Sequence, residues 1–197
     1  RWLGLSDGAV QGLVDLERFG VLQTVITQNV DGLHQMAGSS DVIEFHGNFA
    51  WQRCLDCSRT VKSSAVDLAR IPPRCQCGGI LRPDCVFFGE MIPHEALIRS
   101  QQLSAACDVM LVIGTSATVQ PAASMPLIAK DNGAEIIEIN PEPTPLTARI
   151  SDLPLMSANM DTVTGARMAD YMASRGGIGV LHRFCSVEDN VAMYKRC

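Results

Sequence analysis

Four cysteines in one segment have the type and the spacing to bind a metal ion. Cys54 and Cys57 form a C-x2-C pair, and Cys75 and Cys77 form a C-x-C pair after a gap of 17 residues. Four thiolates suit a tetrahedral Zn²⁺ ion, and a site closed by four protein ligands is structural rather than catalytic. Four free thiols are the alternative, but this Pro-rich segment would then have little to fold around. The spacing therefore predicts a zinc module over about residues 51–84.

Polar residues follow three apolar segments at the point where each segment ends. Residues 27–32 follow the segment at 25–26, residues 114–116 follow 108–113, and Asn140 follows 135–139. In an open parallel sheet, ligands bind at the carboxyl ends of the strands. Small, amide and hydroxyl side chains on three such loops favour a nucleotide-like ligand. Each loop alone is equally consistent with ordinary turn residues, so the spacing does not name the ligand.

The elements that must position these residues alternate along the chain. Periodicity predicts helices and strands in the following ranges: helices at 9–19, 93–106 and 121–131, and strands at 25–26, 42–45, 108–113 and 135–139. Gly20 is placed to end the first helix. Strands with near-continuous apolar runs, separated by helices, predict an α/β fold with a parallel sheet covered on both faces.

Composition excludes several classes of protein. The 197 residues carry a net charge of -5 with no basic block, which argues against a nucleic-acid-binding face. No apolar run approaches the ~20 residues that a membrane span needs. The chain starts at Arg1 without a secretory pattern, and its clustered thiols fit a reducing compartment, so we expect a cytoplasmic fragment of a longer protein.

From residue 1 to about 152, the chain resembles the sirtuin family of NAD-dependent protein deacylases. The matching motifs, in the family's order, are 27–34 (TQNVDGLH), 37–39 (AGS), 44–47 (EFHG), the two cysteine pairs, 81–83 (LRP), 87–90 (FFGE), 114–116 (GTS) and 139–141 (INP). The resemblance implies a Rossmann-like domain with a small zinc-ribbon module. It also implies NAD and structural Zn²⁺ as cofactors, and acyl-lysine proteins or peptides as substrates.

The resemblance also assigns roles to individual residues. His46 becomes the base that deprotonates a ribose hydroxyl after the acyl-lysine oxygen has displaced nicotinamide, and histidine is the side chain most often used for proton transfer near neutral pH. A structural histidine at a strand end is the alternative. The implied cofactor contacts are Gln28, Asn29, Asp31, Gly114, Ser116 and Asn140, and the implied substrate contacts are Val86, Phe88, Gly89 and Glu90. For Phe87 and Phe88 the alternative is core packing.

The chain departs from the family pattern at both ends, and the departure at the N-terminus bears on its function. The family's Gly-Ala-Gly-Ile-Ser loop, which by resemblance cradles the NAD pyrophosphate, would precede Arg1, so we expect this chain to bind NAD poorly. The leading function is NAD-dependent lysine deacylation with transfer of the acyl group to ADP-ribose. The alternative is a non-catalytic, zinc-stabilised remnant that binds peptides.

The tail, residues 153–197, contains the segments 153–164 (LPLMSANMDTVT) and 176–183 (GGIGVLHR). These segments resemble the early strands of the IMP dehydrogenase/GMP reductase family. Strands are predicted at 154–158 and 178–182, and helices at 164–174 and 187–196. Two βα units out of eight cannot close a barrel, so we expect a partial (β/α) fragment with open sheet edges and poor packing. An oxidoreductase function is excluded because the later loops of the barrel are absent.

Overall fold

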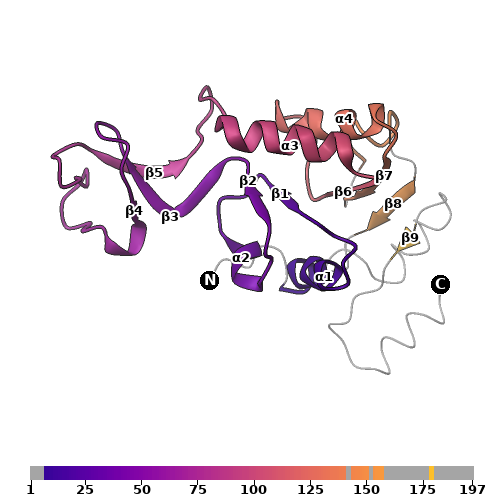
Figure 1. Cartoon of the computed structure of the whole chain (residues 1–197), viewed down its shortest axis with the longest axis horizontal. Coiled ribbons are helices and arrows are strands. Elements are labelled where there is room, and N and C mark those ends of the chain that lie inside the picture. The colour runs from indigo at the N-terminus through magenta and orange to yellow at the C-terminus, as the bar shows by residue number, and fades with distance from the viewer. Residues whose placement is uncertain (1–6, 141–142, 151–152, 158–177, 180–197) are drawn as a thin grey trace. The chain divides into compact units, whose positions relative to one another are not determined.

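The computed structural model describes residues 7–140, 143–150, 153–157 and 178–179 (Figure 1). It divides into two compact units, residues 1–100 and 101–197, which are taken separately below. Among the residues so described, no helix combines the length and the apolar character needed to cross a membrane.

The first unit begins with a helix and a parallel pair of strands. α1 (Asp7–Arg18) buries Val10 and Val14 and contacts the short α2 (Leu33–Ala37). Gly20 follows α1 with a φ of 75°, and the N–H of Val21 bonds back to the carbonyl of Leu16 at 3.1 Å. This left-handed C-terminal turn confirms the predicted end of the helix. β1 (Val25–Thr27) and β2 (Val42–Glu44) then pair in parallel.

An antiparallel three-stranded sheet, in the order β4-β3-β5, completes the first unit. Its strands are β3 (Gly47–Cys54), β4 (Thr60–Lys62) and β5 (Leu81–Cys85), with a 3-10 turn, η1 (Ser63–Ala65), after β4. At Gly47, φ is 79° and an added Cβ would lie 2.2 Å from the carbonyl oxygen of Asp84. Only glycine lets β3 and β5 approach this closely directly after His46.

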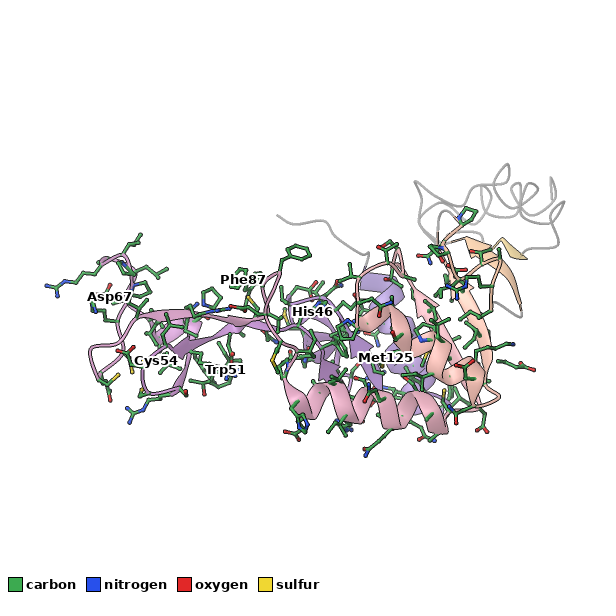
Figure 2. The ribbon with its side chains drawn as sticks, turned by 90° about the horizontal axis from the view of Figure 1, so that it is seen from above. His46, Trp51, Cys54, Asp67, Phe87 and Met125 are labelled. Atoms are coloured by element: carbon green, nitrogen blue, oxygen red, sulfur yellow. The ribbon has the colours of Figure 1, made fainter. Side chains whose placement is uncertain are left out.

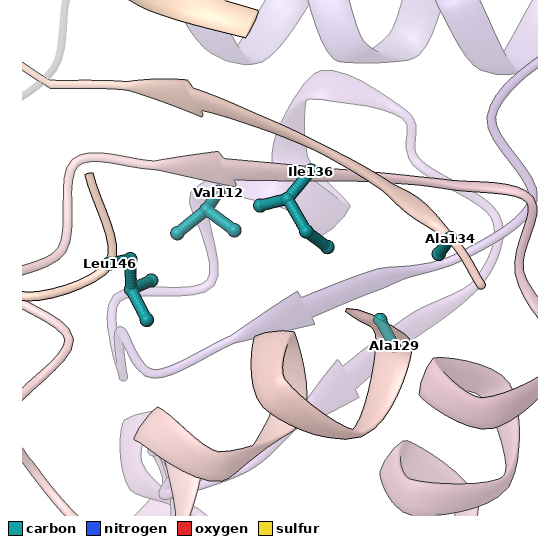
Figure 3. Close-up of a cluster of buried hydrophobic side chains, with 5 residues drawn as sticks. All are labelled: Val112, Ala129, Ala134, Ile136 and Leu146. Atoms are coloured by element: carbon teal, nitrogen blue, oxygen red, sulfur yellow. The ribbon is translucent and has the colours of Figure 1, made fainter. Parts of the chain in front are cut away.

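The division between the units falls within α3 (His94–Ala106), and a parallel sheet in the order β6-β7-β8-β9 follows. Its strands are β6 (Val109–Ile113), β7 (Glu135–Ile139), β8 (Leu153–Ser157) and β9 (Ile178–Gly179), and η2 (Ala122–Ser124) and α4 (Met125–Asp131) lie between β6 and β7 in the chain. Figure 3 shows the core beneath this sheet, which consists of Val112, Ala129, Ala134, Ile136 and Leu146. The α/β class and the parallel strands are as predicted.

The tail departs from its predicted role. β8 pairs in parallel with β7, Ile139 opposite Met156, and β9 pairs with β8. The expectation of open edges is therefore wrong for β8, because its backbone is paired on both sides and continues the sheet of β6 and β7. The predicted helices at 164–174 and 187–196 lie outside the described residues. The predicted domain boundary after residue 152 stays a prediction.

Candidate functional site

The four predicted metal ligands come together at one end of β3. The sulfur atoms of Cys54, Cys57, Cys75 and Cys77 all lie within 4.8 Å of one another. Their closest pairs are Cys57–Cys77 at 3.4 Å, Cys54–Cys77 at 3.5 Å and Cys57–Cys75 at 3.8 Å. Sulfurs about 2.3 Å from a central Zn²⁺ would be about 3.8 Å apart in a tetrahedron. The cluster therefore fits a tetrahedral S₄ zinc site.

Backbone N–H groups favour the thiolate of one of the four cysteines. N–H groups of Cys57 and Asp56 face the sulfur of Cys54 and lower its pKa to about 7. At Gly79, an added Cβ would lie 2.7 Å from that sulfur, so a larger residue there would force the side chain of Cys54 or Asp56 to shift. A thiolate is the form that binds metal.

His46 occupies the opposite end of β3 from Cys54 (Figure 2). Its Nδ1 lies 3.1 Å from the carbonyl oxygen of Gln28. Because a carbonyl oxygen only accepts, this contact requires the proton on Nδ1 and leaves the Nε2 lone pair for a reacting group. The carbonyl of His46 accepts a 2.9 Å bond from the N–H of Val86, and the buried Phe45 ring meets the imidazole edge-on. Backbone and ring contacts thus fix the imidazole.

Asn29 and Asp31 lie on the loop between β1 and α2, and both are exposed. The N–H of Asn29 bonds to the hydroxyl of Thr27 at 3.1 Å. The carboxylate of Asp31 accepts the N–H of Leu33 at 3.0 Å, at the first turn of α2. These local bonds shape the loop that follows β1. This loop lies at the carboxyl end of a parallel strand, where ligand binding is predicted.

The segment at 86–90 contains the predicted substrate contacts, is called the substrate loop below, and follows β5. The side chain of Phe88 is 99% exposed, which rules out core packing for this ring. Phe87 is half exposed and lies under the guanidinium of Arg82, with Cζ 4.7 Å from the ring centroid. Glu90 is paired with Arg82 rather than left free for a ligand. The Arg82 contact holds the pKa of Glu90 at about 2.

In the second unit, the ends of β6 and β7 lie side by side. The N–H of Gly114 bonds to the carbonyl of Ile139 at 3.0 Å, which brings the predicted ligands Gly114 and Asn140 to one edge. Ser116 is exposed, and its hydroxyl lies 2.9 Å from that of Thr118. Asn140 is only 5% exposed.

A buried carboxylate organises the loop beyond β7. Glu138 is 0% exposed and accepts hydrogen bonds from the Asn140 amide at 3.1 Å, from the Thr147 hydroxyl at 2.6 Å and from the Thr144 hydroxyl. Since a buried charge is tolerated only when it is fully hydrogen-bonded, these donors and the loop hold one another in place.

Within the first unit, the structure joins Gln28, His46 and Val86 through direct hydrogen bonds. Within the second, it joins the strand ends at Gly114 and Asn140. Sequence reasoning missed Arg82 and Glu138. Glu138 carried a usable signal, because it is an acidic residue inside a buried apolar strand directly before a polar loop. No comparable signal marked Arg82, apart from its place in the motif at residues 81–83.

Two family models match different parts of the chain. The sequence model of the Sir2 family matches residues 9–121, and that of the IMP dehydrogenase / GMP reductase domain matches residues 134–197. The NAD-dependent protein deacylase of Aquifex aeolicus is 52% identical over 130 residues, which cover 66% of this chain and 54% of the relative. The chain thus spans about half the length of that relative.

Two further matches reach into the tail. The NAD-dependent protein deacylase of Thermococcus kodakarensis is 42% identical over 180 residues, covering 87% of this chain and 70% of the relative. A solved structure described as "Sir2-p53 peptide-NAD+" superposes with a TM-score of 0.71 at 37% identity, covering 85% of this chain and 69% of the other. Residues 1–152 alone are too few to supply either coverage, so both matches include part of residues 153–197.

Proposed function

Because the chain belongs to the Sir2 family, we propose that it serves as an NAD-dependent protein lysine deacylase. The observation that carries the proposal is the position of His46 between Gln28, on the loop after β1, and Val86, at the start of the substrate loop. A base in that place can reach both a dinucleotide and a peptide. The similar deacylases and the Sir2 structure with peptide and NAD support the same reading.

His46 then acts as the general base. NAD, when bound, supplies an ADP-ribose acceptor and nicotinamide as the leaving group. The Gln28 carbonyl keeps the proton of His46 on Nδ1, so that Nε2 accepts a proton from a ribose hydroxyl. Gln28, Asn29 and Asp31 would bind the nicotinamide and its ribose, because amide and carboxylate groups suit carboxamides and hydroxyls.

The remaining predicted contacts complete the proposal. Gly114 and Ser116 would approach the ribose and phosphates, and Asn140 the adenosine ribose. Val86, Phe88 and Gly89 would line the acyl-lysine site, with the peptide added as a strand. The four-cysteine cluster would hold one structural Zn²⁺. A cytoplasmic location belongs to the same proposal, since metal-binding thiols must stay reduced.

Nicotinamide release tests this function. Because the chain alone is expected to bind NAD poorly, it is first extended at its N-terminus with the glycine loop of a Sir2-family relative. The extended chain is incubated with NAD and an acetyl-lysine peptide, and nicotinamide is measured by chromatography. We expect release that depends on the peptide and that falls by ~10²-fold or more in His46→Ala, because proton abstraction is lost. His94→Ala, at the exposed start of α3, is the matched control and should behave as wild type.

Two results would change the assignment. Near-normal turnover by His46→Ala would place the base elsewhere. An extended chain that binds both NAD and the peptide but releases no nicotinamide would favour the alternative, a non-catalytic, zinc-stabilised peptide-binding module.

A further inference from the structure

The substrate loop at residues 86–90 is exposed, yet a single side chain ties its two ends together. Arg82, on β5, donates from Nη2 to the carbonyl oxygen of Cys85 at 2.7 Å. The same nitrogen donates to Oε2 of Glu90 at 2.8 Å, and Nη1 donates to Oε1 of Glu90. One guanidinium therefore bridges the residue before the loop and the last residue of the loop.

Glu90 makes two further hydrogen bonds inside the loop, both with Phe87. Its Oε2 accepts the N–H of Phe87 at 2.9 Å, and its own N–H donates to the carbonyl of Phe87 at 3.0 Å. The ring of Phe87 lies against the guanidinium of Arg82. Both oxygens of the Glu90 carboxylate are thus engaged by the protein, so this residue is poorly placed to bind a ligand.

Arginine suits this position better than any other residue. Its planar fork donates to a carboxylate through two nitrogens and stacks on an aromatic face, whereas a lysine ammonium is a single point charge. A loop held in one conformation before binding loses less entropy when a ligand arrives, and this raises affinity without a new contact. Phe88, fully exposed next to Gly89, is then presented in a fixed position.

We propose that Arg82 is a positioning residue that fixes the substrate loop for an acyl-lysine peptide, and that Glu90 acts through Arg82 rather than by touching the substrate. The inference rests on the proposed function, since it takes residues 86–90 as the peptide-binding segment. It requires no NAD, so peptide binding alone can test it.

The experiment compares Arg82→Met, Arg82→Lys and Glu90→Gln with a matched control. Arg53→Met removes a second bidentate ion pair of the same sheet, between Arg53 and Asp84 at 2.8 and 3.2 Å, which does not touch the loop. Affinity for a fluorescent acetyl-lysine peptide is measured by anisotropy, together with KM and kcat for peptide. Zinc content and melting temperature establish that each variant is folded.

We expect Arg82→Met to raise the peptide Kd and KM by ~10-fold with little change in kcat, and Arg82→Lys to restore part of the affinity. Glu90→Gln should also raise the peptide Kd. The double variant should bind the peptide as tightly as Arg82→Met alone, because both changes break the same Arg82–Glu90 ion pair. Arg53→Met should leave the peptide Kd unchanged. An unchanged Kd in folded Arg82→Met, or an equal loss in Arg53→Met, would overturn the inference.

Hydrogen exchange separates this inference from the proposed function. In Arg82→Met the amides of Phe87 and Glu90 should exchange faster, whether or not the wild-type chain binds a peptide. A wild-type chain that binds no peptide would refute the proposed function. Unchanged exchange at both amides would refute the role of Arg82.

Discussion

At the scale of single residues, hydrogen bonds between distant parts of the chain decide which side chains can act. The imidazole of His46 is oriented by a carbonyl 18 residues away, and the carboxylate of Glu138 is satisfied by an amide and two hydroxyls of the following loop. In both cases the hydrogen bond fixes a loop as well as a side chain. Substitution of His46 or Glu138 should therefore affect the loop to which it is bonded.

Glu138 provides a direct test of such a loop anchor. In Glu138→Ala, the buried amide of Asn140 and the part-buried hydroxyls of Thr144 and Thr147 lose their acceptor, so the free energy of unfolding should fall by at least about 2 kcal/mol. Glu135→Ala is the matched control, because Glu135 is exposed on the same strand and should change stability by less than about 0.5 kcal/mol. Urea denaturation measures both. Equal stabilities for the two variants would contradict the anchor role.

The ion pair of Glu90 predicts a pH dependence. The pKa of this carboxyl is lowered from 4.5 to about 2, chiefly by its hydrogen bond from Arg82. A carboxyl with a lowered pKa stabilises the folded form fully above its ordinary value and loses that contribution as the pH falls towards about 2. A carboxyl NMR titration should therefore give a midpoint near 2, rising towards 4.5 in Arg82→Met. A wild-type midpoint near 4.5 would show that the pair is absent in solution.

At the scale of elements, the antiparallel sheet of β3, β4 and β5 has very little apolar core. Its buried cluster consists of Cys54, Cys75 and Leu81, so two of its three members are themselves predicted metal ligands. So small a core cannot offset the entropy of ordering this segment. We therefore expect metal binding to supply the stabilisation that the apolar core lacks.

Removal of zinc should therefore unfold this sheet. We expect one zinc per chain, and loss of β3–β5 strand structure on treatment with a strong chelator, because metal binding and folding are coupled in such modules. Cys77→Ser should lose the metal, whereas Cys107→Ser, outside the cluster, should keep it. Metal analysis and circular dichroism are the measurements. A zinc-free chain with an intact sheet would refute the structural role.

Sequence periodicity predicted the bounds of four helices and strands well. α1, α3, β6 and β7 lie within a residue or two of their predicted bounds, and the four cysteines cluster as their spacing indicated. β3 escaped prediction because half of its residues are exposed, only Cys54 is buried, and no alternation marks it. The bonds of Arg82 escaped prediction because they depend on how the loop folds back on β5, which local patterning does not encode.

At the scale of the whole molecule, two short strands of the tail extend the second unit's sheet. β8 lies between β7 and β9, so it covers an edge that would otherwise be open. This pairing differs from the expectation of open sheet edges at β8, whereas the predicted poor packing of the tail stays a prediction. Sequence resemblance missed the pairing because a parallel strand followed by a helix serves equally well in an open sheet and in a barrel.

Truncation tests whether β8 supports the sheet. A chain ending at residue 152 leaves β7 as an unpaired edge, so its melting temperature should fall by roughly 5 °C or more. A chain ending at residue 179 keeps β8 and β9 and is the matched control. Equal melting temperatures for all three forms would show that the tail strands add no stability.

The central claim is that this chain transfers an acyl group from lysine to ADP-ribose, and mass spectrometry of the products tests it most directly. The chain is extended at its N-terminus with the glycine loop of a Sir2-family relative, because alone it is expected to bind NAD poorly. With NAD and an acetyl-lysine peptide, we expect the extended chain to form deacetylated peptide, nicotinamide and acetyl-ADP-ribose in equal amounts, and its His46→Ala variant to form none at a measurable rate. Deacetylated peptide without an ADP-ribose product, or no product from a folded, zinc-loaded extended chain that binds NAD, would contradict the claim.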